Sequence, residues 1–208
     1  MNERHVMHVI ALCGLSTAGK TTAADYIQEE FGAARLRFAK PLRDMLQPLG
    51  LTQAELWGDK KQVPCDALNG CTPEHVLREL GMWVRKTLGV DFLALQIERQ
   101  LEEKLNEVIY QTEFVVMDDL RCVNEREALR RFQKLHDESV RVHIVNVHRA
   151  AALQRIDPAT LDSRSPKYVP LEGEHKFFTY DYVIYNDSTP EDFYKSLRQL
   201  IHEIELKG

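Results

Sequence analysis

The segment at residues 14–21, GLSTAGKT, matches the phosphate-loop pattern G-x-x-x-x-G-K-[ST] at every fixed position. An apolar run at residues 6–12 precedes it, and a stretch with helical character follows it, from about residue 20 to residue 30. In this strand–loop–helix context, successive backbone N–H groups and the helix N-terminus form a nest for anions. The segment therefore predicts a buried parallel strand, an α/β fold and the binding of a nucleoside triphosphate.

The residues of this loop have separate tasks in the prediction. Gly14 and Gly19 allow backbone angles and close approaches that a Cβ atom would prevent. Lys20 can reach the β- and γ-phosphates, and the Thr21 hydroxyl can bind Mg²⁺. The loop residues that we expect to contact ATP are Gly14, Ser16, Ala18, Gly19, Lys20, Thr21 and Thr22.

Three further short apolar runs predict strands, at residues 114–117, 140–147 and 182–185. Helical patterns occupy the intervals, at residues 73–88, 124–136 and from residue 190 onward. Buried strands that alternate with helices are typical of a parallel sheet with helices on its faces. We therefore expect a single α/β domain over residues 1–208, with the three-layer fold of the P-loop NTPases.

Two segments depart from this alternation. Residues 40–110 are almost entirely helical and are interpreted as a helical insert. Residues 149–178 are polar and are interpreted as a lid over the site. The basic residues of this lid are Arg149, Arg155, Arg164 and Lys167, of which Arg149 is expected to contact the nucleotide.

Composition excludes several classes of partner. With 27 Lys and Arg against 32 Asp and Glu, the formal net charge of −5 argues against a protein that binds nucleic-acid polymers. No run of apolar residues is long enough to span a membrane, and no signal peptide is recognisable. The cysteines form no CxxC pair, so ordinary reduced thiols fit them better than a partial zinc site at Cys65, Cys71 and His75. We expect a cytoplasmic protein that acts on a small molecule.

Acidic residues follow the predicted strand at residues 114–117. Asp118 and Asp119 come directly after it, and an acid at this point of a phosphate-loop fold commonly supports the bound metal. A solvated turn is the alternative interpretation, because acids are common after strands. Arg121 follows within three residues and adds a cation to the same strand end.

The predicted helix at residues 73–88 carries a different signal. Its apolar positions, at three- and four-residue steps, are Val76, Leu77, Leu80, Val84 and Leu88. Arg78 and Arg85 share another face, with the backbone of Gly81 exposed between them. Such a pair suits a dianionic phosphate, although a solvated charged face is an equal alternative. Before this helix, a short strand-like segment at residues 35–39 contains Phe38, and Lys40 and Arg43 follow it as two more cations.

These residues together resemble the phage-type deoxynucleoside monophosphate kinases, within the P-loop nucleotide kinases. The resemblance extends over nearly the whole chain. Besides residues 14–27, it is carried by FAKPLR at 38–43, RELG at 78–81 with Arg85, DLR at 119–121 with Asn124 and Glu125, and YVIYND at 182–187. It implies transfer of the γ-phosphoryl group of ATP to a (deoxy)nucleoside monophosphate, with ATP and Mg²⁺ as cofactors.

The resemblance also implies roles for individual residues. Lys20, Asp119 and Arg121 would be catalytic, and Thr21 with Asp119 would hold the metal. Asn186 and Asp187 follow the last strand, where such kinases place the adenine of ATP. The residues expected to bind the acceptor are Phe38, Lys40, Arg43, Arg78, Arg85 and Arg121.

Two other functions remain open from the sequence. A dephospho-coenzyme A kinase has a similar last strand and helix. A nucleotide-dependent switch would bind ATP or GTP without a rate that depends on an acceptor. The amphipathic stretch at residues 92–109 predicts either the interface of a homodimer or packing within the chain.

Overall fold

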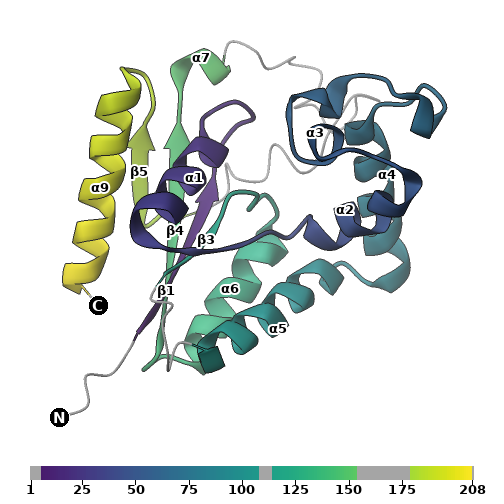
Figure 1. The fold of residues 1–208 in the computed structure, drawn as a ribbon. Coiled ribbons are helices and arrows are strands. Elements are labelled where there is room, and N and C mark those ends of the chain that lie inside the picture. Colours follow the sequence, from purple (N-terminus) through teal and green to yellow (C-terminus); the bar gives the residue numbers. More distant parts are fainter. Residues whose placement is uncertain (1–5, 108–113, 154–178, 208) are drawn as a thin grey trace. The chain divides into compact units, whose positions relative to one another are not determined.

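A parallel sheet organises the part of the chain that the computed structural model describes, residues 6–107, 114–153 and 179–207. Within these residues the strand order is β2-β3-β1-β4-β5 (Figure 1). The strands are β1 Met7–Cys13, β2 Ala34–Leu36, β3 Phe114–Met117, β4 Val140–His148 and β5 Tyr182–Tyr185. All of the pairings are parallel, so the carboxyl ends of the strands lie at one edge of the sheet.

Burial explains why the strands form where the sequence predicts them. Every residue of β1 and β3 is buried, as expected of parallel strands that are covered on both faces. The predicted strands at residues 114–117 and 182–185 have these same limits in the structure. The strand predicted at 140–147 is one residue longer, and the one predicted at 6–12 is shifted by one residue at both ends. The strand-like segment at 35–39 forms a shorter strand, β2, which ends at Leu36.

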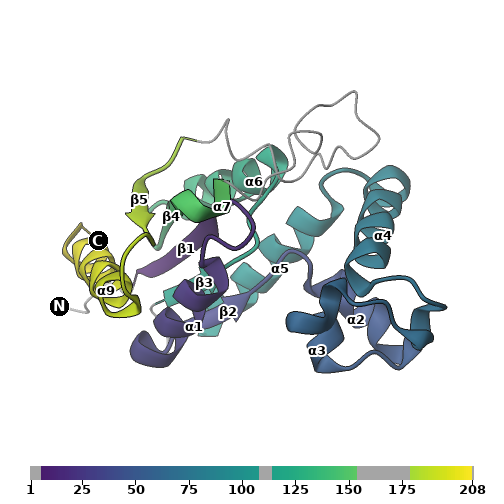
Figure 2. The same cartoon turned by 90° about the horizontal axis from the view of Figure 1, so that it is seen from above.

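Helices cover both faces of the sheet, which confirms the three-layer α/β fold (Figure 2). On one face, α1 Lys20–Phe31 and α9 Pro190–Lys207 share a core with β1, β3, β4 and β5. Ile27 of α1 and Leu197 and Ile201 of α9 are fully buried there. On the other face, α6 Val123–Leu135 buries Ala128, Leu129 and Phe132. Burial of this apolar surface is the main stabilising contribution to such a domain.

The helix starts follow the capping rules that the sequence indicates. Thr189 is the N-cap of α9, and its Oγ1 accepts a hydrogen bond from the N–H of Asp192 (3.2 Å). Thr72 caps α4, Pro73–Leu88, in the same way through the N–H of His75 (3.2 Å). In both helices a proline occupies the first turn, where its missing N–H costs no helical hydrogen bond.

The chain divides into two compact units. The sheet and its helices form the first unit, and Phe38–Gln96 forms the second. We predicted a helical insert over residues 40–110, and the second unit ends earlier because α5, Phe92–Glu107, continues into the first. Besides α4 and the start of α5, the second unit contains α2 Lys40–Leu46, α3 Gln53–Leu56 and three 3-10 turns, Gln47–Leu49, Asp59–Gln62 and Asp66–Leu68.

The second unit has its own small core. Leu42, Val84 and Leu93 form one buried cluster, against which Leu77 and Leu80 pack. The predicted apolar stripe of α4 is therefore present, with one correction: Leu88 is 48% exposed and does not belong to it. The helix ends at this residue, and the next residue, Gly89, has a φ of 106°.

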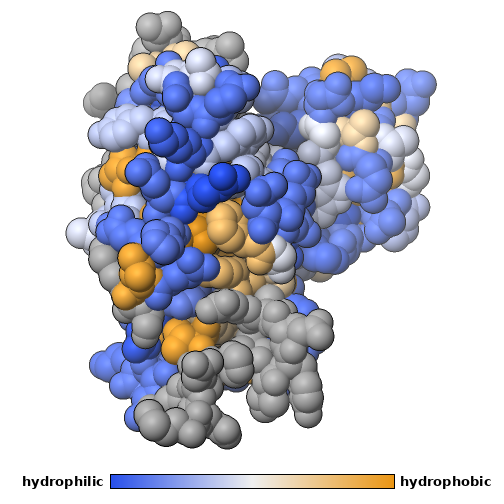
Figure 3. Space-filling model, turned by 60° about the vertical axis from the view of Figure 1, so that its left-hand side comes forward, coloured by the Kyte–Doolittle hydropathy of each residue, from blue (hydrophilic) through white to orange (hydrophobic). Residues whose placement is uncertain are grey.

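The amphipathic stretch predicted at residues 92–109 corresponds to α5. Leu93, Ala94, Ile97 and Leu101 are at most 1% exposed, so packing within the chain accounts for its apolar side. The homodimer interface on this stretch stays a prediction. Figure 3 shows a largely hydrophilic surface, interrupted by small hydrophobic areas. In the described part of the chain, no helix is both long enough and apolar enough to cross a membrane.

Two histidines on neighbouring strands form a contact that the sequence did not indicate. Nδ1 of His8 on β1 lies 3.1 Å from Nε2 of His143 on β4, and the His8 ring also packs against Phe114. Burial, together with the nearby His8, lowers the pKa of His143 to about 4. Burial and the positive charge of Arg141 lower the pKa of His8 as well. The pair is therefore neutral at pH 7, with one ring donating a hydrogen bond to the other.

This pair makes the stability of the fold depend on pH. Because the folded-state pKa of His143 lies below the unfolded value of 6.5, its contribution is present above about pH 6.5 and is lost as the pH falls toward 4. We expect the free energy of unfolding in urea to fall by about 1–2 kcal/mol between pH 7.5 and pH 5 from this group alone. His143→Gln keeps a polar partner for His8 and should flatten the pH dependence. An equally steep dependence in that variant would contradict the assignment.

Candidate phosphate-binding site

The phosphate loop connects the carboxyl end of β1 to the first turn of α1. Its backbone takes left-handed angles at three points: φ is 129° at Gly14, 65° at Thr17 and 107° at Gly19. A threonine in this region costs of order 1 kcal/mol, which the surrounding structure has to offset. No side chain caps the N-terminus of α1, so its first N–H groups and the positive end of its dipole are placed to bind an anion.

Neighbouring segments explain the two glycines of the loop. A Cβ atom on Gly14 would lie 2.4 Å from the carbonyl oxygen of Val147 on β4. One on Gly19 would lie 2.4 Å from Nδ2 of Asn186, which donates a hydrogen bond to the carbonyl oxygen of Ala18 (2.9 Å). The loop is therefore held in shape by the strand beside it and by the segment that follows β5.

Lys20 lies where the sequence predicts the phosphate-binding amine. Its Nζ donates hydrogen bonds to the carbonyl oxygens of Gly14 (2.8 Å) and Leu15 (2.7 Å). These contacts keep the ammonium group at the mouth of its own loop, within reach of a phosphate chain bound there. Of the other predicted loop residues, Ser16, Thr21 and Thr22 are exposed and Ala18 is buried.

Asp118 is the acid that the structure brings to the phosphate loop. Its Oδ2 accepts a hydrogen bond from Oγ1 of Thr21 (3.1 Å), at the start of α1. Two arginines bind the same carboxylate: Arg35 through Nη2 (2.5 Å) and Arg37 through Nε (2.7 Å) and Nη2 (3.4 Å). Burial alone would raise the pKa of Asp118, but hydrogen bonds from Arg37 and Arg35 outweigh it and lower the pKa to about 2. The carboxylate therefore keeps its negative charge at neutral pH.

We predicted that Asp119 would hold the metal, and the structure pairs its neighbour with Thr21 instead. Asp118 is 7% exposed, and Asp119 is more accessible. The structure therefore brings Asp118 to Thr21, and the role of Asp119 as a metal ligand stays a prediction.

Sequence reasoning missed Arg35 and Arg37. Their spacing of two residues in a strand-like segment was an available signal, because alternate residues of an extended chain share one side. In the structure Leu36 pairs with Met117, so the residues that follow them, Arg37 and Asp118, lie beside each other. Arg35 also forms an ion pair with Asp25 of α1.

These residues fit a magnesium ion that accompanies a nucleoside triphosphate. Mg²⁺ in such sites takes few protein ligands and completes its shell with phosphate oxygens and water. The hydroxyl of Thr21 and the ionised Asp118 are oxygen donors within 3.1 Å of each other, at the start of the helix that follows the loop. When bound, the ion would neutralise charge on the phosphates.

Asn186 and Asp187, the two residues predicted near adenine, lie after β5. Asn186 contacts the phosphate loop, and Asp187 contacts the start of the predicted lid. Asn186 bonds to the phosphate loop as described, and its N–H also bonds to the carbonyl oxygen of His148 (2.8 Å). Oδ1 of Asp187 accepts a hydrogen bond from the N–H of Ala150 (2.6 Å), which directly follows Arg149. The structure thus brings Asn186, Asp187 and the backbone next to Arg149 to the same edge of the sheet.

Arg121 lies in the loop between β3 and α6. The N–H groups of Arg121 and Cys122 both donate to Oε2 of the buried Glu125, at 3.0 Å each. Glu125 therefore fixes the backbone of this loop and the start of α6. Arg121 is kept at the carboxyl end of β3, close in sequence to Asp118.

The predicted acceptor residues other than Arg121 all belong to the second unit. Phe38 is 2% exposed, Lys40 pairs with Asp44 (2.6 Å), and the guanidinium of Arg43 lies 4.1 Å from the ring centre of Trp57. Nη2 of Arg78 lies 2.9 Å from Nδ1 of His75. Each of these cations is held by a local partner on its own unit.

The prediction for Gly81 needs a correction. We expected its backbone to be exposed between Arg78 and Arg85, but Gly81 is buried. A Cβ atom there would meet Nη1 of Arg85 at 3.1 Å and Cδ1 of Leu42 at 3.3 Å. Nη1 of Arg85 also donates to the carbonyl oxygen of Gly81 (3.3 Å). The glycine gives room to the arginine and to the packing of α2 on α4.

Most of the predicted lid at residues 149–178 lies outside the described residues, including Arg155, Arg164 and Lys167. Only its first part is described, with the short helix α7, Ala150–Leu153.

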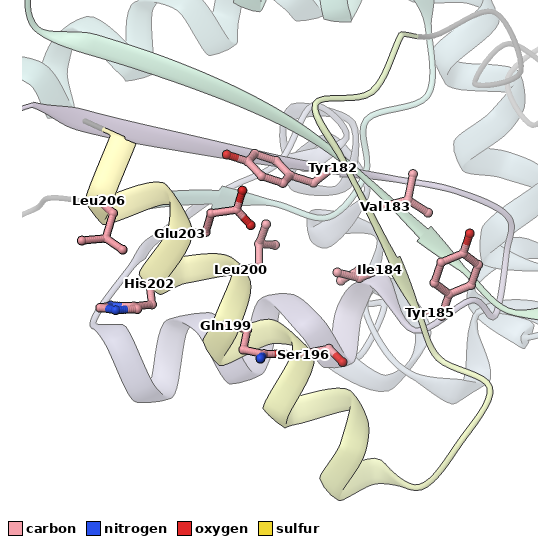
Figure 4. Close-up of a pocket in the computed structure, with 10 residues that line it drawn as sticks. All are labelled: Tyr182, Val183, Ile184, Tyr185, Ser196, Gln199, Leu200, His202, Glu203 and Leu206. Carbon is pink, nitrogen blue, oxygen red and sulfur yellow. The ribbon is translucent and has the colours of Figure 1, made fainter.

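A groove of about 530 Å³ lies between β5 and α9 (Figure 4). Tyr182, Ile184, Leu200 and Glu203 are among its lining residues, and none of the predicted site residues lines it. It has no phosphate-binding loop, and we do not assign the site to it.

Comparisons with known proteins support the fold. No family model matches the chain. Over 92% of its length it is 26% identical to a protein of Acanthamoeba polyphaga mimivirus that carries the provisional name deoxynucleotide monophosphate kinase, and the match covers 94% of that protein. Among solved structures, a dephospho-CoA kinase from Campylobacter jejuni matches with a TM-score of 0.50 and 16% identity, over 95% of this chain and 98% of the other.

A provisionally named kinase from Chloroflexus aurantiacus matches with the same TM-score of 0.50 and 14% identity, over 99% of this chain and 100% of the other. The chain has the fold of the P-loop kinases. The resemblance to the deoxynucleoside monophosphate kinases is thereby confirmed as a similarity over almost the whole chain.

The close approach at Gly14 gives a test of the loop. Gly14→Ala would place a Cβ atom 2.4 Å from a backbone oxygen at a φ of 129°, so we expect the free energy of unfolding to fall by about 2–3 kcal/mol and ATP binding to weaken. Gly32→Ala is the matched control, because Gly32 has a φ of 65° but no atom within 4 Å of its Cβ position. It should cost only about 1 kcal/mol and leave ATP binding intact. Equal losses in urea unfolding would contradict the steric explanation.

Proposed function

We propose that this protein is an ATP-dependent kinase that phosphorylates a (deoxy)nucleoside 5′-monophosphate to the diphosphate. The observation that carries the proposal is the phosphate loop whose Thr21 is hydrogen-bonded to the buried, ionised Asp118. This pair supports the donor half of the reaction, in which a nucleoside triphosphate is bound with Mg²⁺. The similarity to the mimivirus protein supports the choice of acceptor.

Separate groups of residues would bind the phosphoryl donor, ATP, and the acceptor monophosphate. Lys20 would leave the loop carbonyls and bind the β- and γ-phosphates, and Thr21 with Asp118 would hold Mg²⁺. The segment after β5, with Asn186 and Asp187, would bind the adenine. The acceptor monophosphate would be held by the cations predicted for it: Lys40, Arg43, Arg78, Arg85 and Arg121.

Phosphoryl transfer asks these side chains for alignment and charge neutralisation rather than for covalent chemistry. An oxygen of the acceptor phosphate forms the new bond to the γ-phosphorus while the bond from that phosphorus to the bridging oxygen of ADP breaks. Lys20 and the loop N–H groups would stabilise the charge on the leaving diphosphate. The arginines would offset repulsion between the two anionic substrates.

Two alternatives remain. The fold similarity to a dephospho-CoA kinase favours that acceptor as the second candidate. A nucleotide-dependent switch would hydrolyse ATP at a slow rate that no acceptor changes, and it would have no use for the additional cations.

The first test is ADP formation by the full chain with ATP and Mg²⁺, against a panel of ribo- and deoxynucleoside monophosphates and dephospho-coenzyme A. We expect a rate that depends on one or a few deoxynucleoside monophosphates. Lys20→Ala should lower it at least about 100-fold, because one donor to developing charge is lost. Lys195→Ala, an exposed lysine on α9, is the matched control and should retain the rate. A rate only with dephospho-coenzyme A, or one indifferent to every acceptor, would refute the proposal.

A second test separates acceptor binding from ATP binding. Arg85→Gln should raise the KM for the acceptor at least about 10-fold, since a charged hydrogen-bonding partner of the phosphate is lost, with little change in the KM for ATP. Lys86→Gln removes the charge of the exposed neighbouring residue and serves as control. An unchanged acceptor KM in Arg85→Gln would remove this residue from the acceptor site.

A further inference from the structure

We propose that Arg37 binds the acceptor phosphate and that Asp118 couples this binding to occupation of the Mg²⁺–ATP site. The inference rests on the proposed function and adds to it a residue that neither the sequence motifs nor the comparisons indicate. It is carried by the hydrogen bonds around one carboxylate.

The donors to Asp118 are unequally distributed over its two oxygens. Oδ1 is bound by Nε of Arg37 at 2.7 Å. Oδ2 receives Oγ1 of Thr21 at 3.1 Å, Nη2 of Arg35 at 2.5 Å and Nη2 of Arg37 at 3.4 Å. A carboxylate oxygen has about two lone-pair positions, so the three donors compete for Oδ2. A cation bound by Thr21 and Asp118 would bind this oxygen. The hydrogen bond from Nη2 of Arg37, at 3.4 Å, is the longest of the three and would break first.

The side chains of the two arginines differ in exposure. The side chain of Arg35 is 11% exposed and lies between two carboxylates, with Nη1 on Asp25 and Nη2 on Asp118. Arg37 is 23% exposed, and Nε and Nη2 both donate to Asp118. Arg35 therefore balances the buried charge, whereas the more exposed Arg37 is accessible to an incoming anion.

The location of Arg37 suits a substrate phosphate. Arg37 and Asp118 come directly after the paired residues Leu36 and Met117, at the carboxyl ends of β2 and β3. In open parallel α/β sheets, ligands bind outside this edge of the sheet. A guanidinium fork matches two oxygens of a phosphate, and an arginine beside Thr21 would hold that phosphate near the transferring group.

Coupling between acceptor binding and Mg²⁺–ATP binding through Asp118 is expected to be positive, and this can be measured. When Mg²⁺, bound together with the triphosphate, is held by Oδ2 of Asp118, the 3.4 Å hydrogen bond from Nη2 of Arg37 to this oxygen weakens, which favours a hydrogen bond from Nη2 to the acceptor phosphate. By reciprocity, the acceptor must then strengthen the binding of Mg²⁺–ATP by the same factor. A purely structural Arg37 would produce no such coupling.

The experiment is calorimetric titration of the full chain with dAMP, dCMP, dGMP and dTMP, with and without Mg²⁺ and a non-hydrolysable ATP analogue. We expect the nucleotide that serves as substrate to bind at least about 5-fold more tightly in the presence of both, and not with the analogue in EDTA. In Arg37→Gln, acceptor binding should weaken at least about 10-fold and the coupling factor should fall to about 1. Without acceptor, this variant should bind the Mg²⁺–analogue complex as tightly as the wild type or more tightly, because a competitor for Asp118 is gone.

Arg198→Gln is the matched control, since it removes an exposed arginine that pairs with Glu30 on the same unit (3.4 Å). It should retain both acceptor affinity and coupling. If Arg37→Gln does not fold, Arg37→Lys replaces it: the charge stays, the fork is lost, and acceptor binding should still weaken several-fold.

The outcomes separate the two proposals. A wild type that phosphorylates no nucleoside monophosphate overturns the proposed function and this inference with it. If the wild type is active but an Arg37 variant keeps the acceptor affinity and the coupling of the wild type, only the inference is overturned. Weaker binding of the Mg²⁺–analogue complex in a folded Arg37→Gln would likewise show that Arg37 merely supports Asp118.

Discussion

The carboxylate of Asp118 joins the segments that meet at the phosphate-binding end of the sheet. It accepts hydrogen bonds from the start of α1 through Thr21, from β2 through Arg35, and from the residue after β2, Arg37. A buried charge is costly unless it is paired, and the two guanidinium groups provide this pairing. Because they also keep the pKa of Asp118 at about 2, the carboxylate is negatively charged at neutral pH.

The phosphate loop depends equally on segments outside its own sequence. Gly14 lies against the backbone of β4, and Gly19 against the side chain of Asn186 after β5. The left-handed conformation of Thr17 is maintained within a loop that is fixed at both of these points. The conformation of the loop thus depends on residues of β4 and on the segment after β5. This explains why a short motif predicts a function only when a strand precedes it and a helix follows it.

The parts that sequence reasoning located are those governed by local pattern. The strands β3 and β5 are buried apolar runs, and α4 and α9 begin at threonine caps followed by proline, so their limits can be read directly. Local pattern could not predict that Asp118 contacts Thr21. This contact depends on the residue at which β3 ends and on the register of β3 with β2. Arg35 and Arg37 were missed because β2 has only three residues. Both arginines bind a carboxylate that lies some 80 residues away in the sequence, and no local pattern indicates this contact. Gly81 was misjudged since a helical wheel gives the face of a residue but not the neighbour that covers it.

The distribution of burial within this charged cluster decides which variants are informative about chemistry. Removing one partner of a buried ion pair leaves the other charge uncompensated and destabilises a protein by about 3–5 kcal/mol. Replacement of Asp118 would leave two guanidinium groups without their shared anion, and replacement of Arg35 would remove a cation that pairs with both Asp25 and Asp118. Loss of activity in either variant would therefore be ambiguous between a damaged fold and a damaged site. Arg37 is the more exposed partner, and Asp118 keeps Arg35 and Thr21 when it is gone. A change in substrate coupling at Arg37 can accordingly be attributed to the site, because the buried charge remains paired.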